Sequence, residues 1–93
     1  MTKTKKDLVR ETAKSVGVNQ REALAVIDSF LNVIVSTLIA NNRIELRGFG
    51  VFSTKYRKPR QARNPKTGES VNLSQRRIPI FKPSKILKQK VME

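Results

Sequence analysis

Positively charged side chains are concentrated in one short stretch of the second half of the chain. Residues 55–66 read KYRKPRQARNPK and hold six Lys or Arg, two prolines, one aromatic residue and no acid. Each Lys or Arg that meets a phosphate releases condensed counterions, so such a stretch binds a nucleic acid strongly at low salt. A solvated, charged loop has the same composition, and this stretch alone leaves both interpretations open.

A proline stands in a turn signal within the same region. Pro65 lies between Arg63-Asn64 and Lys66, and Gly68 follows, which is typical of a tight turn. An apolar side chain at the tip of a two-stranded ribbon can also enter a base step and unstack it. An isolated Asn-Pro is more often an ordinary turn, and only the basic setting, with few apolar side chains, favours the wedge.

Two further groups of lysines coincide with expected helix starts at Thr4 and Ser84. These lysines are Lys3, Lys5, Lys6, Lys82 and Lys85. A helix N-terminus offers free backbone N–H groups and partial positive charge to a phosphate. Lysines that only make helix ends soluble would be placed in the same way, so both interpretations stand.

The composition of the whole chain favours a polyanionic partner and excludes most catalytic chemistry. Of the net charge of +13, residues 1–50 contribute +3 and residues 51–93 contribute +10, so the charge is concentrated in the second half. The chain has no Cys and no His, which removes disulfides, thiol nucleophiles and the usual ligands and bases of hydrolases. Its carboxylates are scattered along the sequence. We therefore expect no enzymatic activity, metal, cofactor or small-molecule substrate.

The N-terminus, MTKTKKD, has no apolar stretch behind it, and no run of about 18 apolar residues follows. We expect neither a secretory signal nor a membrane span, and a cytoplasmic location.

The first half of the chain predicts two helices. Thr4 and Asp7 are typical of a helix start and Gly17 of a helix end. A second helix is expected from about Gln20 to Ala40, with a cap close to the capping-box pattern at Asn19 and a stop at Asn41-Asn42. Two apolar stripes run along this second helix, formed by Leu24, Ile27, Leu31, Ile34 and Leu38 and by Ala23, Val26, Phe30 and Val33. That apolar surface is too wide for one short helix to cover, so either strands or a second copy of the chain must cover the rest.

The second half predicts strands and a short final helix. Residues 43–47 alternate as a strand, and residues 51–58 form the second strand of a hairpin after Gly48-Phe49-Gly50. Residues 69–75 resume strand-like alternation beyond the Pro65 turn, which predicts a projecting two-stranded arm. Residues 78–81 return as an apolar strand, and the last helix opens at Ser84 with Ile86, Leu87 and Val91 as its inner face.

Three motifs give the chain a resemblance to a known family. They are RIELRGFG at residues 43–50, RNPKTGE at residues 63–69 and FKP at residues 81–83. In this order and spacing they resemble the HU and integration host factor family of bacterial DNA-bending proteins, over essentially the whole length. The resemblance implies an α+β fold: an intertwined dimer with a helical base, a β-sheet saddle and two projecting β-ribbon arms. It further implies that Pro65 of each arm intercalates at the minor groove of duplex DNA and bends it, in the service of nucleoid organisation and DNA transactions.

The chain departs from the family at Ser84, where family members usually carry Gly, so we expect a phosphate to approach the last helix less closely. Arg47 and the strand around it look more like the beta subunit of integration host factor than HU. In that subunit the matching arginine takes part in sequence preference, whereas the HU branch binds with little preference. This one sequence does not decide between the HU branch and the integration host factor branch.

We therefore expect one domain over residues 1–93, with a helical dimerisation body and start of sheet (1–54), a β-ribbon arm (55–77), and a return strand with a C-terminal helix (78–93). The wedge is Pro65. The arm residues expected to bind DNA are Lys55, Arg57, Lys58, Arg60, Arg63, Asn64, Lys66, Arg76 and Arg77. Those of the body are Lys3, Thr4, Arg47, Lys82, Ser84 and Lys85. The dimer core is expected at Leu31, Ile34, Leu38, Phe49, Phe52 and Phe81.

The expected partners are double-stranded DNA and a second copy of the chain, or a related subunit in a heterodimer. The charge alone equally allows a small basic RNA-binding or ribosome-associated protein.

Overall fold

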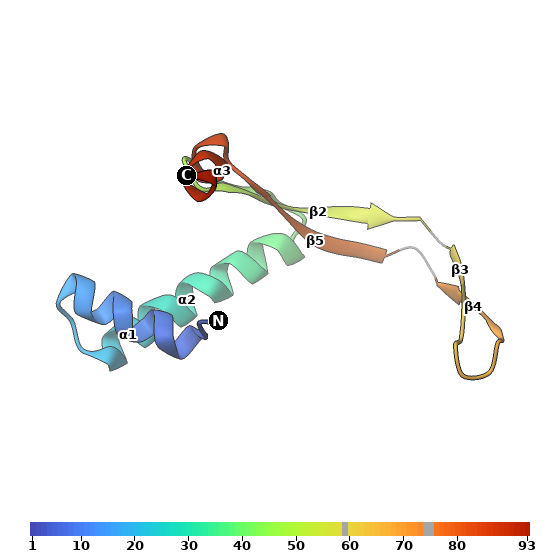
Figure 1. The fold of residues 1–93 in the computed structure, drawn as a ribbon, viewed down its shortest axis with the longest axis horizontal. Coiled ribbons are helices and arrows are strands. Elements are labelled where there is room, and N and C mark those ends of the chain that lie inside the picture. Colours follow the sequence, from blue (N-terminus) through green and yellow to red (C-terminus); the bar gives the residue numbers. More distant parts are fainter. Residues whose placement is uncertain (59, 74–75) are drawn as a thin grey trace. The chain divides into compact units, whose positions relative to one another are not determined.

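The fold mixes helices with antiparallel strands, as expected for an α+β protein. The computed structural model describes residues 1–58, 60–73 and 76–93. Its elements, drawn in Figure 1, are α1 (Lys5–Val16), α2 (Gln20–Ile39), β1 (Ile44–Leu46), β2 (Gly50–Arg57), β3 (Arg60–Arg63), β4 (Ser70–Leu73), β5 (Arg76–Pro83) and α3 (Lys85–Met92). The chain divides into two compact units, Met1–Ser36 and Thr37–Glu93, and each is described by itself.

Helix α1 begins and ends at the residues that the sequence predicts. Thr4 is its N-cap: the Asp7 backbone N–H donates to Thr4 Oγ1 at 3.4 Å, and the Thr4 backbone N–H donates to Asp7 Oδ2 at 2.9 Å. Gly17 ends the helix in the left-handed conformation, with φ of 85°, where a residue without Cβ meets no steric penalty. The expected cap residues at both ends are confirmed.

The core of the first unit is small. Helix α2 begins at the expected cap residue, Asn19: the Glu22 backbone N–H donates to Asn19 Oδ1 at 2.8 Å, and Asn19 Nδ2 donates to Glu22 Oε1 at 3.1 Å. Behind that cap, Ala23 is buried with Val9 and Ala13 of α1, and Ile27 packs against them. Small side chains at this contact let the two helices approach closely, but they bury little apolar surface.

Helix α2 ends in a Schellman motif. Asn41 has φ of 63°, the left-handed conformation that Asn tolerates. The Asn42 backbone N–H donates to the Thr37 carbonyl at 3.1 Å, and the Asn41 backbone N–H donates to the Leu38 carbonyl at 3.0 Å. These two bonds are the ones that define the motif, and they confirm the predicted stop at Asn41.

The apolarity of α2 bears on the expectation that no segment spans a membrane, without overturning it. Over an 18-residue window its mean hydropathy is 1.7, so by length and composition it could cross a membrane. The expectation of no such segment relies on uninterrupted apolar runs, whereas an average tolerates the polar residues of α2. One of these polar residues, Asp28, pairs with Lys5 Nζ of α1 at 2.7 Å. Helix α2 thus packs against α1.

The second unit contains a three-stranded antiparallel sheet in the order β1-β2-β5. Strands β1 and β2 form the predicted hairpin, in which Gly48 adopts φ of 82° and the Phe49 backbone N–H donates to the Leu46 carbonyl at 2.9 Å. Strand β5 lies along the whole of β2, from the Gly50–Pro83 pair to the Arg57–Arg76 pair. Strands β2 and β5, which are separated by the arm in the sequence, thus form one long antiparallel pair, the β2–β5 hairpin.

Strands β3 and β4 pair with each other in a separate two-stranded sheet, from the Arg60–Leu73 pair to the Arg63–Ser70 pair. This is the predicted arm hairpin. The pairing of β2 with β5 continues through residues 55–57, the expected start of the arm, and the boundaries of the arm stay a prediction. Ser74 and Gln75, where the second arm strand is expected to end, lie outside the described residues.

Helix α3 begins at Ser84, as predicted, and the Leu87 backbone N–H donates to Ser84 Oγ at 3.0 Å. Its expected inner face is only partly realised: Leu87 is half-buried, whereas Ile86 and Val91 are exposed. Burial of Ile86 and Val91 would require contacts from outside the single chain.

Candidate nucleic-acid interface

The register of β2 and β5 sorts their side chains onto two faces. Residues paired directly across antiparallel strands point to the same face, and successive residues alternate. The pairs Val51–Lys82, Ser53–Ile80, Lys55–Ile78 and Arg57–Arg76 therefore share one face, which we call the basic face. It carries four cations, and neither strand contains an acid, so its charge is uncompensated along the hairpin.

The opposite face carries the aromatic side chains, and we call it the aromatic face. Its pairs are Phe52–Phe81, Thr54–Pro79 and Tyr56–Arg77. The Phe52 and Phe81 rings lie 4.7 Å apart between centroids, and Phe49 packs against Phe81 at 5.4 Å. Phe52 is half-buried, whereas Phe49 and Phe81 are 47% and 40% exposed in the single chain. The rings form a cluster, and their expected place in a dimer core stays a prediction.

The basic face extends onto β1. Glu45 pairs with Val51, so it lies on this face, and strand alternation places Arg43 and Arg47 at its flanks. Arg43 Nη2 lies 3.7 Å from Glu45 Oε2, which partly neutralises the carboxylate. The net charge of this edge is therefore positive, and Arg47 is available for an anionic partner.

A groove of about 720 Å³ lies on the β2–β5 hairpin, towards the arm. It is lined by Lys55, Tyr56, Arg57, Lys58, Arg76, Ile78, Ile80, Phe81 and Lys82. Five of these are cations and four are apolar or aromatic, a lining suited to a polyanion with apolar edges. Five of the residues expected to bind DNA therefore meet in one place.

The arm tip is a well-formed turn with an exposed proline. Asn64 organises it: its Oδ1 accepts from the Lys66 backbone N–H at 2.9 Å, and its carbonyl accepts from the Gly68 backbone N–H at 2.7 Å. Pro65 is exposed at this tip between the exposed Arg63 and Lys66. Asn64 thus shapes the turn that presents Pro65, in addition to its expected role in binding. The side chain of Arg60 lies outside the described residues.

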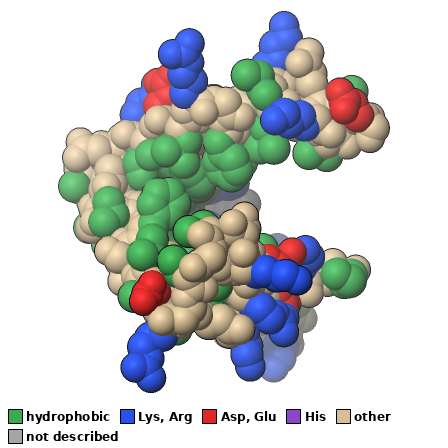
Figure 2. Space-filling view, turned by 90° about the vertical axis from the view of Figure 1, so that its left-hand side faces the viewer, with side chains coloured by type: hydrophobic (Ala, Val, Ile, Leu, Met, Phe, Trp, Pro, Cys, Tyr) green, Lys and Arg blue, Asp and Glu red, His purple; other side chains and the backbone are tan. Residues whose placement is uncertain are grey.

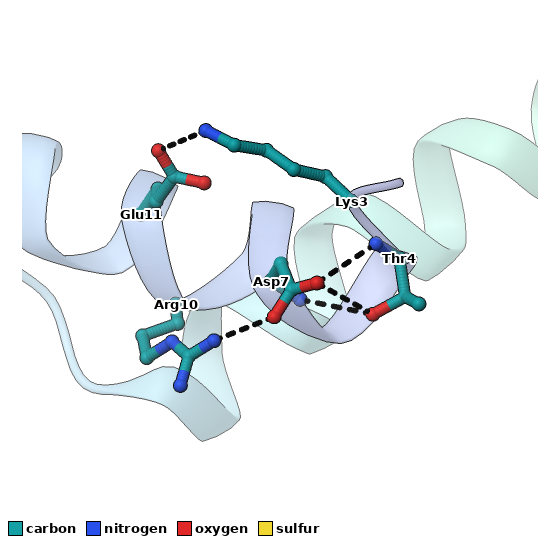
Figure 3. A network of polar contacts seen from close by, with 5 residues as sticks. All are labelled: Lys3, Thr4, Asp7, Arg10 and Glu11. Atoms are coloured by element: carbon teal, nitrogen blue, oxygen red, sulfur yellow. Dashed lines mark hydrogen bonds and ion pairs between the residues drawn. The ribbon is translucent and has the colours of Figure 1, made fainter. Parts of the chain in front are cut away.

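At the start of α1, polar side chains are already engaged with one another, as Figure 3 shows. Lys3 Nζ pairs with Glu11 Oε1 at 2.9 Å, and Arg10 Nη2 pairs with Asp7 Oδ1 at 2.6 Å. Hydrogen bonds from the Thr4 backbone and hydroxyl, helped by Arg10 and Lys3, lower the pKa of Asp7. The expected contacts of Lys3 and Thr4 with DNA would thus have to compete with these internal bonds.

Ser84 is engaged in a similar way at the start of α3. Its Oγ accepts from the Leu87 backbone N–H, and its own backbone N–H donates to the Phe49 carbonyl at 2.9 Å. Lys82 and Lys85 on either side are exposed. The Ser84 hydroxyl therefore occupies the Leu87 backbone N–H, which a phosphate could otherwise use.

The sequence treats Arg76 and Arg77 alike, but the structure separates them. Arg76 lies on the basic face and Arg77 on the aromatic face, where its Nη2 donates to the Ile39 carbonyl at 2.7 Å. Strand alternation is a signal that distinguishes the two. Sequence reasoning misses Thr54, whose hydroxyl donates to Asn41 Oδ1 at 2.9 Å, because a threonine in a strand gives no such signal.

The apolar stripes of α2 are largely open in the single chain. Leu31 is 42% exposed, Ile34 and Leu38 are half-buried, and Val26, Phe30 and Val33 are exposed. Hydrophobic side chains are visible at the surface in Figure 2. Exposed apolar area on this scale marks an interaction site.

These features coincide with a known family. A sequence profile of the family described as bacterial DNA-binding protein matches residues 3–92. The chain belongs to this family, which includes HU and integration host factor. Integration host factor subunit beta of Aeromonas hydrophila is 45% identical over 89 residues, covering 95% of each chain. Integration host factor subunit alpha of Marinobacter nauticus is 41% identical over 88 residues, covering 95% of this chain and 88% of that one.

A solved structure of an HU and integration host factor family member has the same fold. The HU chain of an Anabaena HU–DNA cocrystal structure superposes with a TM-score of 0.91 at 34% identity, covering 96% of this chain and 97% of that one. The superposition covers the helices as well as the antiparallel strands, so the two chains share the α+β fold.

Proposed function

We propose that this protein binds duplex DNA as a dimer, bends it, and so organises the nucleoid and assists DNA transactions. The observation that carries the proposal is the continuity of one cationic surface. The basic face, with Lys55, Arg57, Arg76 and Lys82, leads along the hairpin towards an arm that ends in exposed Pro65. Family membership supports the same function.

Phosphate contacts supply most of the affinity in this proposal. Arg57, Lys58 and Arg76 meet the backbone at the groove, while Arg63 and Lys66 meet it beside the tip, each releasing counterions. Pro65 enters a base step, at an energetic cost that is recovered when the bent DNA meets more protein. The DNA in the Anabaena HU cocrystal supports the nature of the partner.

Sequence preference then depends on deformability and on Arg47. A site that is easily unstacked is bound more tightly because it costs less to bend. Arg47 on the flank of β1 adds selectivity, as the resemblance to the beta subunit of integration host factor implies. Lys82 and Lys85 hold the flanking DNA, with Lys3 joining once it leaves Glu11.

Dimerisation covers the apolar surface that the single chain leaves open. Within the described residues, the buried apolar side chains are Val9, Ala13 and Ala23, a core too small to fold a chain of this length unaided. A second copy seated on Leu31, Ile34 and Leu38 would enlarge it; a related subunit would serve equally in a heterodimer. The protein acts without catalysis, in the cytoplasm, on the nucleoid.

A binding comparison tests the function. Fluorescence anisotropy is measured with an intact duplex, the same duplex carrying a nick, and a structured RNA of equal length, at two salt concentrations. We expect the nicked duplex to bind most tightly, because its unstacking is partly complete, and binding to weaken steeply with salt. Tighter binding to the RNA would instead favour the ribosome-associated alternative.

A further inference from the structure

The C-terminal end of α2 leaves carbonyl groups that the helix cannot pair itself. The Schellman motif provides donors for two of them, those of Thr37 and Leu38. The next carbonyl, that of Ile39, accepts a hydrogen bond from Arg77 Nη2 at 2.7 Å. The donor comes from β5, 38 residues along the chain, so the cap of the helix is completed by a strand.

The charge of Arg77 suits this place. The carbonyl end of a helix carries partial negative charge and is stabilised by a cation in its last turn. Helix α2 has no basic residue in its own last turn, so the guanidinium of Arg77 supplies one from β5. A charge-assisted bond of this kind is stronger than a bond between neutral groups.

A second bond joins the same two elements. Thr54 Oγ1 of β2 donates to Asn41 Oδ1, at the left-handed residue of the helix cap, over 2.9 Å. Thr54 and Arg77 both lie on the aromatic face. The face opposite the cations is therefore fastened to the end of α2 through two residues, one on each strand.

The position of Arg77 along the hairpin gives this fastening a consequence. Tyr56 and Arg77 form the pair next to Arg57 and Arg76, the last pair of the three-stranded sheet before the arm. A contact here fixes the root of the arm rather than the middle of the sheet. Arg76, one residue away, points to the basic face and is exposed.

We propose that Arg77 is a positioning residue that fixes the arm root to the C-terminal cap of α2, and so directs the arm, while Arg76 contacts phosphate. The effect on DNA rests on the proposed function. The effect on the helix cap does not, because both partners of the bond belong to the protein. The two arginines differ in the face they occupy and not in their chemistry, so each is the matched control of the other.

The first test needs no DNA. Amide hydrogen exchange at Asn41 and Asn42, the two donors of the Schellman motif, is compared in the parent, Arg76→Met and Arg77→Met. We expect exchange to accelerate by about tenfold in Arg77→Met, the change expected for removal of one hydrogen bond to a charged group. Arg76→Met should match the parent. Arg77→Lys, which keeps a cationic donor, should restore most of the protection.

The second test uses a duplex labelled at both ends for energy transfer, with binding measured over a salt series. Arg76→Met should reduce the slope of log affinity against log salt by about 0.9 for each phosphate that the side chain no longer neutralises, with little change in energy transfer at saturation. Arg77→Met should keep the slope and lower the energy transfer, because misdirected arms bend the duplex less. Arg77→Lys should recover the bend.

The proposal is overturned if exchange at the cap is the same in Arg77→Met as in the parent, or rises equally in Arg76→Met. It is also overturned if the salt slope falls as much in Arg77→Met as in Arg76→Met, which would make Arg77 a phosphate ligand. If the parent neither binds nor bends DNA, the proposed function fails, and the exchange measurement still decides whether Arg77 caps α2. If Arg77→Met fails to fold, Arg77→Gln, which removes the charge and keeps an N–H donor, carries the comparison: a parent-like salt slope supports the proposal, and a slope reduced as much as in Arg76→Met overturns it.

Discussion

At the scale of single residues, short side chains with local hydrogen bonds decide where the elements begin and end. Thr4, Asn19 and Ser84 each accept a backbone N–H three residues later, and Asn41 takes the left-handed turn that stops α2. These positions are predictable because the bonds involve near neighbours in sequence. The cationic side chains of the basic face and the arm tip take no part in these caps.

Asp7 links the first cap to pH. Its hydrogen bonds with Thr4, with help from Arg10, hold its pKa below the ordinary value of 3.8. The ionised Asp7 carboxylate therefore stabilises the folded protein fully above pH 3.8. This stabilisation is lost as the pH falls through the lower pKa of the folded state. We predict that Asp7→Asn lowers the melting temperature near neutral pH, and that the difference from the parent shrinks in acid. Thermal unfolding monitored by circular dichroism across pH measures this; a difference that stays constant down to the lowest pH would contradict it.

Gly50 is predicted to be intolerant of even one extra methyl group. A Cβ built there would lie 2.5 Å from the Lys82 carbonyl oxygen and 2.5 Å from the Phe81 ring. The backbone oxygen cannot move without disturbing the β2–β5 pairing, so Gly50→Ala should destabilise the fold by about 1–3 kcal/mol, measured by chemical denaturation. Gly68→Ala is the control for crowding, because a Cβ there meets nothing within 4 Å; its cost comes only from its positive φ. Equal stability of parent and Gly50→Ala would disprove the close approach of the strands.

At the scale of elements, the sequence predicts more of the helices and hairpins than of the sheet faces. Strand alternation is visible at residues 43–47 and 51–58, but pairing register is not, and a slip of one residue exchanges the two faces. Alternation separates Arg76 from Arg77, but without the register the sequence does not show which of the two lies on the basic face. The cap on Ile39 depends on a contact between residues 38 positions apart, which no local pattern encodes.

The apolar stripe of α2 makes a prediction about assembly. Leu31→Asp places a charge on the stripe that we assign to the dimer seam, where an unpaired buried charge costs about 3 kcal/mol or more. We expect this variant to be unfolded or monomeric in light scattering at concentrations at which the parent is dimeric. Asn32→Asp adds the same charge at an exposed polar position of the same helix and should remain dimeric. A dimeric, stable Leu31→Asp protein would show that the seam lies elsewhere.

The arm is predicted to be the first site of proteolysis. An isolated two-stranded hairpin is marginally stable in water, and among the described strands β3 and β4 pair only with each other. Brief digestion with trypsin should cut after Arg63 or Lys66 before it cuts α2, with fragments identified by mass spectrometry. Saturating duplex DNA should slow these cuts. A first cut within α2, or no protection by DNA, would contradict the assignment of the arm.

At the scale of the whole molecule, two surfaces with different physics share the work. Apolar side chains that the single chain leaves exposed drive assembly, and the basic face together with the arm meets the phosphates. The charge sets how strongly DNA is attracted, whereas the exposed proline at the arm tip sets how far it bends. The two contributions can be separated, because one depends on salt and the other does not.

The most direct test of the central claim is the bend produced by Pro65→Ala. The variant keeps every Lys and Arg, so the salt dependence of its affinity should match that of the parent. It loses the wedge, so energy transfer between the labelled ends of a bound duplex should fall sharply, and the preference for nicked DNA should fall with it. A Pro65→Ala protein that bends the duplex as far as the parent would contradict the account and leave the arm as an electrostatic strap.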